Sequence, residues 1–107
     1  MKREKITGEV LELRDLCTSV KLFIKKGDYE KSNRLICEAM GRFPHSPQPH
    51  NLLGVLMEVT GDHVMAMKHF RAAWDLDPTY KPARQNLSIC GNTITDNLCA
   101  YDENDCA

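Results

Sequence analysis

Residues 51–78 read NLLGVLMEVTGDHVMAMKHFRAAWDLDP, and this stretch decides the fold. Apolar side chains recur at helical spacing on both sides of Gly61-Asp62. They are Leu53, Leu56, Met57 and Val59–Thr60 before it, and Ala66, Phe70, Ala73–Trp74 and Leu76 after it. A glycine in the left-handed conformation followed by a helix-starting carboxylate is typical of a tight turn between helices. The stretch therefore predicts a helix hairpin that ends before Pro78, since the residue preceding a proline avoids helical angles.

The same pattern occurs 34 residues earlier, where Lys26-Gly27-Asp28-Tyr29 aligns with Thr60-Gly61-Asp62-His63. Six more pairs fall into register at this offset: Leu13 with Pro47, Phe23 with Met57, Ser32 with Ala66, Ile36 with Phe70, Ala39 with Ala73, and Pro44 with Pro78. A period of this length indicates stacked supersecondary units, because a single hairpin cannot bury its own apolar face. The sequence thus predicts an all-α fold of antiparallel helix hairpins, about five helices in total.

Residue size sharpens this prediction. Gly54, Ala66 and Ala73 lie where the two helices of a hairpin must approach closely, and a larger side chain would force the helices apart. Trp74, the single tryptophan, is expected in the core between the second hairpin and the helix that follows.

The second unit resembles the tetratricopeptide-repeat (TPR) family, whose pattern is W-x2-L-G-x2-Y, then A-x3-F, then P. It matches at Leu53-Gly54, Met57, Ala66-x3-Phe70, Ala73 and Pro78, with His50 in place of the family's Trp. The first unit matches less well, because Ser19 and Val20 stand where Leu-Gly is expected and Ser32 replaces Ala. The resemblance implies a short right-handed TPR solenoid.

The resemblance also implies an organisation of the chain. Residues 13–46 would form the first TPR and 47–80 the second, with 81–91 as a capping helix. Residues 1–12 would extend the first helix towards the N-terminus, starting near Lys2. Residues 92–107 are rich in Thr, Asn and Asp, and are expected to form an acidic, disordered tail.

In TPR proteins the first helices of successive repeats line a concave surface that binds peptides. The resemblance places twelve residues there: Arg14, Cys17, Lys21, Ile24 and Lys25 from the first helix, Gln48, Asn51, Val55, Glu58 and Val59 from the third, and Gln85 and Ile89 from the capping helix. This mixture of charged, amide and apolar groups suits a peptide with apolar anchors and acidic groups.

One family-specific ligand is not expected. TPR domains that clamp the C-terminal carboxylate of heat-shock chaperones use Lys, Asn and Arg side chains, and the matching positions here are Cys17, Lys21, Leu52, Pro82 and Asn86. These residues cannot form a two-carboxylate clamp, so a chaperone tail is excluded as the expected partner.

Composition restricts the class of partner further. The chain carries 14 basic and 15 acidic residues, and this balance gives no basic footprint for nucleic acid. The charge is nevertheless uneven: residues 1–84 hold all 14 basic residues against 11 acidic ones, a net charge of +3, whereas the last 23 residues carry −4. No apolar run is long enough for a signal peptide or a membrane span, so a cytoplasmic protein with no membrane partner is expected.

Catalysis and metal binding are not expected either. The five cysteines show no CxxC pair and no zinc-like spacing. His63 and His69 are six residues apart and would face different sides of a helix, and no H-E-x-x-H or phosphate loop occurs. The sequence therefore predicts no catalytic residues, no metal site and no cofactor.

Two functions remain open. The first is an adaptor or scaffold that binds a peptide or helix of another protein in the concave surface. The second is a structural subunit that forms a homodimer through its N-terminal helix and repeat ends, because two repeats are fewer than most arrays need. A fragment of a longer repeat array is a third, weaker interpretation that the acidic tail disfavours.

Overall fold

The computed structural model describes residues 8–92 and 99–106, and this part of the chain is all-α. Five α-helices follow one another: α1 (Gly8–Lys25), α2 (Tyr29–Arg42), α3 (Pro47–Val59), α4 (His63–Leu76) and α5 (Lys81–Asn92). A short 3-10 helix, η1 (Glu103–Asp105), lies near the C-terminus. The predicted fold class is confirmed, and the described part of the first helix begins at Gly8. Residues 2–7, which the sequence placed in that helix, lie outside the described residues.

The α1–α2 and α3–α4 turns have the same backbone structure. Gly27 and Gly61 adopt φ angles of 83° and 99°, which side chains with a Cβ rarely tolerate. The N–H of the next residue reaches back to the carbonyl of the third-last residue of the preceding helix, at 2.8 Å for Asp28 to Phe23 and 2.7 Å for Asp62 to Met57. This is the Schellman motif, and it explains why both helices stop at the glycine.

The next helix starts at the aspartate of each turn. The side chain of Asp28 accepts a hydrogen bond from the N–H of Lys31 at 3.1 Å, and that of Asp62 from the N–H of Met65 at 3.2 Å. Each carboxylate thus satisfies an otherwise unpaired N–H at a helix N-terminus. The two-residue signal Gly-Asp therefore ends one helix and begins the next in both hairpins.

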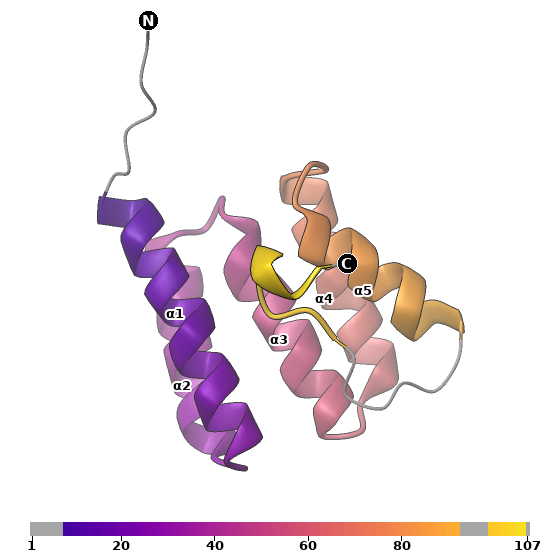
Figure 1. Ribbon diagram of the computed structural model, residues 1–107, viewed down its shortest axis with the longest axis horizontal. Coiled ribbons are helices and arrows are strands. Elements are labelled where there is room, and N and C mark those ends of the chain that lie inside the picture. Colours follow the sequence, from indigo (N-terminus) through magenta and orange to yellow (C-terminus); the bar gives the residue numbers. More distant parts are fainter. Residues whose placement is uncertain (1–7, 93–98, 107) are drawn as a thin grey trace, which may run out of the picture.

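Helix α3 lies at the centre of the molecule. It contacts α1, α2, α4 and α5, and residues 51–56 are all buried. Figure 1 shows the α1–α2 pair on one side of α3, and α4 and α5 on the other. The core joins apolar residues of α1 to α4 with two residues near the C-terminus, Cys99 and Tyr101. The close α3–α4 approach predicted at Gly54 and Ala66 is confirmed, because both residues are buried, as is the Phe70 ring that packs against Gly54.

Trp74 differs from its prediction as a core residue. Its side chain is 40% exposed, and its indole N–H donates to the carbonyl of Pro78 at 3.1 Å. The α4–α5 contact is filled instead by Ala73, Tyr80 and Ala83, which form a small buried cluster. Small alanines bring these helices close together and leave no room for an indole between them.

The C-terminal residues also differ from their prediction. Residue 92 completes α5, and the described residues 99–106 pack against the helices instead of forming a disordered tail. Residues 93–98 and 107, to which the same prediction applied, lie outside the described residues. Cys99, Ala100 and Tyr101 are buried, and η1 lies against α5. We refer to residues 99–106 as the C-terminal segment. Local composition predicted disorder, and the partners that hold the segment come from α1, α3 and α5, up to 84 residues away in sequence.

Candidate functional site

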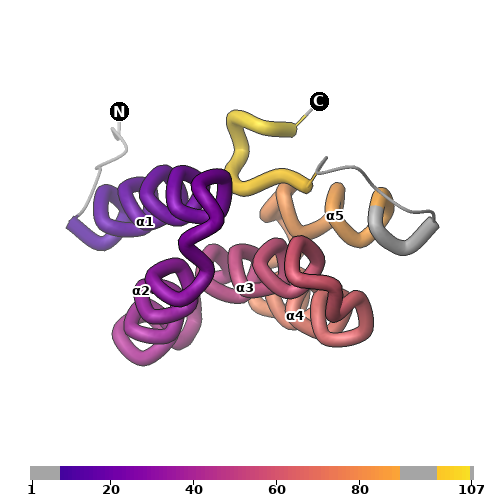
Figure 2. The backbone as a smooth tube through the Cα atoms, turned by 90° about the horizontal axis from the view of Figure 1, so that it is seen from below, coloured from indigo at the N-terminus to yellow at the C-terminus, as the bar shows by residue number. Residues whose placement is uncertain are grey.

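The candidate site is the surface that α1, α3 and α5 share, which we call the α1/α3/α5 face. Figure 2 shows α1 and α5 on either side of α3, with the C-terminal segment above α3 between them. Helices α2 and α4 lie on the opposite side of this layer. The first helix of each hairpin and α5 therefore contribute side chains to one surface, and α2 and α4 support it from behind.

Two buried asparagines hold the backbone of the C-terminal segment. The amide nitrogens of Asn51 on α3 and Asn86 on α5 donate to the carbonyl of Ala100 at 3.0 and 2.9 Å. The side-chain oxygen of Asn86 accepts from the N–H of Ala100 at 2.7 Å, and its amide nitrogen also lies 3.0 Å from the side-chain oxygen of Asn51. Asn86 thus contacts both polar groups of one residue's main chain, as a neighbouring β-strand would.

Burial makes these hydrogen bonds important. Asn51, Asn86 and Ala100 are all fully buried. A buried amide without a partner costs about 1–3 kcal/mol, so the two asparagines favour the state in which a peptide backbone lies between them. The pair therefore binds extended main chain, and its hydrogen bonds involve no side-chain atom of the bound residue.

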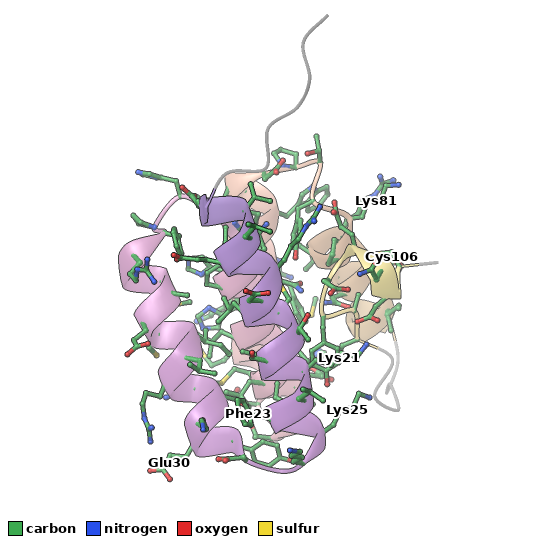
Figure 3. All side chains as sticks on the ribbon, turned by 60° about the vertical axis from the view of Figure 1, so that its left-hand side comes forward. Lys21, Phe23, Lys25, Glu30, Lys81 and Cys106 are labelled. Atoms are coloured by element: carbon green, nitrogen blue, oxygen red, sulfur yellow. The ribbon has the colours of Figure 1, made fainter. Side chains whose placement is uncertain are left out.

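Two lysines of α1 provide the second set of contacts. Lys21 and Lys25 lie one helical turn apart and project on the side of the C-terminal segment (Figure 3). Their ammonium groups lie 5.5 and 5.7 Å from the centre of the Tyr101 ring, which is within the range of a cation–π interaction. Lys21 also forms a salt bridge of 2.7 Å with Asp105. Two like charges at this spacing repel each other, so an anionic or aromatic ligand is favourable here.

The C-terminal segment is preorganised by its own hydrogen bonds. Asp105 accepts from the N–H of Tyr101 at 2.9 Å, and Asp102 accepts from the N–H of Asn104 at 3.0 Å. Burial alone would raise the pKa of Asp105, but the hydrogen bonds from Lys21 and Tyr101 and the charge of Lys21 outweigh it, and the pKa is lowered overall. Asp105 is thus a charged anchor at neutral pH. Burial raises the pKa of Tyr101 to about 12, so its phenol stays neutral.

Part of the face remains open beside the C-terminal segment. A cavity of about 490 Å³ lies between the first turns of α1 and residues 102–104. Its lining includes Arg14, Cys17, Gln48 and Tyr80. Burial raises the pKa of Cys17 to about 12, with a further contribution from nearby acids, so this thiol is protonated and a poor nucleophile. The cavity is suited to binding, and its thiol is not activated for chemistry.

Buried polar atoms line this cavity without strong partners. The side-chain oxygen of Gln48 has no hydrogen-bond partner among the described residues, and the buried Tyr80 hydroxyl has only the Cys17 thiol, a weak partner, beside it.

The twelve residues predicted for the concave surface divide into four groups. Arg14, Cys17 and Gln48 line the open cavity, whereas Lys21, Lys25 and Asn51 contact the C-terminal segment. Ile24, Val55 and Val59 belong to the buried core or pack against it. Glu58 lies 3.0 Å from His63, and Gln85 and Ile89 are half-buried on α5. Val55 is completely buried and Ile24 is 4% exposed, so both belong to the core and neither lies on the open surface to which the sequence assigned it.

The prediction did not include several residues that complete the site: Tyr80, Asn86, Ala100, Tyr101 and Asp105. A signal was present in the last nine residues, where a buried-type stretch, Cys-Ala-Tyr, precedes three acids in a chain whose body is basic. This signal predicts contact with the body, but gives no position for it.

Among the residues that the structure describes, no group of three or more His, Cys, Asp or Glu side chains could hold a metal ion. Within the same ranges, no helix combines the length and apolar character needed to cross a bilayer. His50 and His69 stack with ring centres 6.0 Å apart, and burial lowers the pKa of both.

Comparisons with known proteins give a distant relationship. Over 83 residues the chain is 26% identical to human RANBP2-like and GRIP domain-containing protein 8 and to the human and chimpanzee E3 SUMO-protein ligase RanBP2. The matched stretch is 76% of this chain but only 5% of the first relative and 3% of the two ligases. No family model matches the chain, and no solved structure does.

Proposed function

We propose that this chain is a protein-interaction module of the TPR type, and that its α1/α3/α5 face binds an extended peptide of another protein. The observation that carries the proposal is the asparagine pair. Asn51 and Asn86 bind the peptide backbone at Ala100 through hydrogen bonds that involve no side-chain atom of the bound residue. Main-chain hydrogen bonds supply affinity in this mode of recognition, and flanking side chains supply specificity. The adaptor role predicted from the sequence takes this form.

Three further features support the proposal. The two hairpins have matching Schellman turns and N-caps, which fits a repeat of 34 residues. The lysines of α1 and Arg14 give the face a basic edge for an acidic peptide. The relatives are much longer proteins, so the matched stretch is a small module within each of them. We propose binding without catalysis, in keeping with the protonated Cys17 thiol.

A selection from a displayed random-peptide library tests this function without a known partner. The full chain is compared with two charge-reversed variants, Lys21→Glu on the face and Lys68→Glu on the exposed outer side of α4. We expect the wild type and Lys68→Glu to enrich one set of peptides that Lys21→Glu loses. Failure to enrich any peptide, or the same peptides on all three proteins, would refute binding at this face.

A second candidate function, homodimer formation, is favoured by a different surface. Leu11 and Leu22 are exposed on α1 and are three helical turns apart, so they share one side of the helix. Beside them a cavity of about 240 Å³ between α1 and α2 is lined by Leu16, Leu35 and Phe43. Sedimentation equilibrium of the wild type and of Leu11→Glu/Leu22→Glu distinguishes the two functions. A dimer that the double variant abolishes would establish self-assembly, and a wild-type monomer at all concentrations would exclude it.

A further inference from the structure

The C-terminal segment occupies the α1/α3/α5 face in the way that a bound peptide would. Its contacts come from three separate helices, whereas its internal hydrogen bonds are those of the turn over residues 102–106 and the bond from the N–H of Tyr101 to Asp105. The segment therefore shows, position by position, which ligand the face accepts. This inference rests on the proposed peptide-binding function and specifies its ligand and its control.

The first position must be small. Ala100 is fully buried, and both of its main-chain polar groups are bonded to the side chain of Asn86. Its carbonyl also accepts from Asn51 on the facing helix. A long side chain at this position would have to lie between two helices whose asparagines touch each other at 3.0 Å. Alanine, glycine or serine fits, because a close-packed interior has no room for a larger group.

The second position favours an aromatic ring. Tyr101 is buried and belongs to the same core cluster as Val20, Ile24 and Val55. Its ring also faces the ammonium groups of Lys21 and Lys25. An aliphatic residue would keep the burial and lose the cation–π interactions, so phenylalanine or tyrosine is preferred.

The third requirement is an acid four residues after the aromatic position. Asp105 accepts from Lys21 through one oxygen at 2.7 Å and from the N–H of Tyr101 through the other at 2.9 Å. The carboxylate thus closes the turn at η1 and pairs the lysine at the same time. A neutral residue would satisfy at most one of these two partners.

We propose that the α1/α3/α5 face recognises peptides in which a small residue precedes an aromatic one and an acid follows four positions later. We further propose that residues 99–106 are a resident ligand of this kind, which a partner peptide must displace. A tethered ligand competes at an effective concentration on the order of millimolar, so the wild-type chain binds only partners that exceed this competition.

The open cavity offers a partner peptide additional contacts, which allow it to compete with the tethered C-terminal segment. The resident ligand leaves the side-chain oxygen of Gln48 unpaired and the Tyr80 hydroxyl with only a thiol beside it. A longer peptide that continues past the acid, along α1, can present a carboxylate to Arg14, which lines the cavity. It gains contacts there that the resident segment does not make.

The test uses a fluorescent peptide of residues 99–107 under reducing conditions, with binding followed by anisotropy. It is added to the full wild-type chain and to a released variant, Tyr101→Ala/Asp105→Ala, whose own segment lacks two anchors. We expect the released variant to bind the peptide at least about tenfold more tightly than the wild type does. A peptide with lysine in place of Asp105 should bind neither protein.

A charge exchange identifies the contact. Adding Lys21→Glu to the released variant should weaken binding of the natural peptide and create binding of the Asp105→Lys peptide. The single variant Asp105→Ala, which keeps the buried Tyr101, repeats the experiment if circular dichroism shows that the double variant is unfolded.

Three results would overturn the inference. Equal affinity of wild type and released variant would show that the segment does not compete, and absence of binding to either folded released variant would show that the face does not recognise this pattern. A wild-type dimer that the released variant loses would place the segment on a second copy of the chain. The peptide-library selection can still succeed in each case, so failure of this inference is distinct from failure of the proposed function.

Discussion

At Gly54 the backbone of α3 lies against the ring of Phe70 on α4, and this contact sets the distance between the two helices. A Cβ at this position would overlap the ring, which is itself fully buried and cannot move aside. The glycine is therefore required by packing, even though its φ angle is not in the left-handed region.

Gly54→Ala should lower the free energy of unfolding by about 1–3 kcal/mol, because overpacking a buried contact costs more than the better helix propensity of alanine returns. Gly41→Ala is the matched control. Gly41 is exposed in α2 with no atom near its absent Cβ, and alanine there should stabilise by up to about 1 kcal/mol. Urea denaturation measures both, and a Gly54→Ala protein as stable as wild type would contradict the prediction.

Asn86 is the residue on which docking of the C-terminal segment depends most. Asn86→Leu would leave the N–H of Ala100 without its partner, the carbonyl of Ala100 with Asn51 alone, and the side-chain oxygen of Asn51 unpaired. We expect a loss of about 1–3 kcal/mol in the free energy of local opening. Amide hydrogen exchange at Ala100 should then become at least about fivefold faster, whereas exchange in α2 should change little. Asn33→Leu, at an exposed position of α2, controls for the change of residue type.

At the scale of elements, the C-terminal segment is joined to α1 by the salt bridge between Lys21 and Asp105, whose carboxylate can be protonated at low pH. The pKa of Asp105 is lower in the folded protein than in the unfolded chain. Asp105 therefore stabilises docking of the segment fully above its unfolded-state pKa, and this stabilisation is lost as the pH falls through its folded-state pKa. Docking should therefore weaken below about pH 4, given the ordinary pKa of an aspartate. The amide shifts of Ala100 and Tyr101 report this transition, and Lys21→Met should move its midpoint to higher pH. A midpoint unaffected by Lys21→Met would contradict the assigned cause.

Helices α3 and α4 carry a second titrating pair, His50 and His69. Burial lowers the pKa of both, and the proximity of His50 lowers that of His69 further. The unfolded chain therefore binds more protons than the folded one in the window just below the ordinary pKa of about 6.5. Stability should fall as the pH drops from 7 through this window. His69→Gln should reduce this pH dependence of the free energy of unfolding.

At the scale of the whole molecule, the C-terminal segment covers part of the core that the five helices form. Cys99 is buried by this docking, and Cys17 lies in the cavity beside it, while Cys37 is exposed on α2. The reactivities of these three thiols therefore report the position of the segment without any partner present.

Alkylation by N-ethylmaleimide, read by peptide mass spectrometry, should be fast at Cys37 and at least about tenfold slower at Cys17 and Cys99, because the reagent attacks exposed thiolate. The released variant should bring Cys99 close to the rate of Cys37 and leave Cys37 itself unchanged. Equal protection of Cys99 in both proteins would mean that the substitutions do not release the segment.

Much of this architecture could be predicted from sequence because its signals are local. Gly27-Asp28 and Gly61-Asp62 fix the ends of four helices through contacts within a few residues. The small residues at the α3–α4 contact predict a close approach of the two helices, because a larger side chain would force the helices apart. The side of α1 that carries Lys21 and Lys25 follows from helical spacing alone.

The remaining features depended on contacts between distant residues. The sequence placed Val55 on the surface and residues 92–107 in a disordered tail, whereas the segment is held by asparagines 49 and 14 residues from Ala100 and by a lysine 84 residues from Asp105. No local pattern records such distances, because the energy of each contact exists only once the helices are packed. The sequence by itself determined the helices and their turns, and the tertiary structure alone decided that the chain's own C-terminal residues lie on the predicted binding surface.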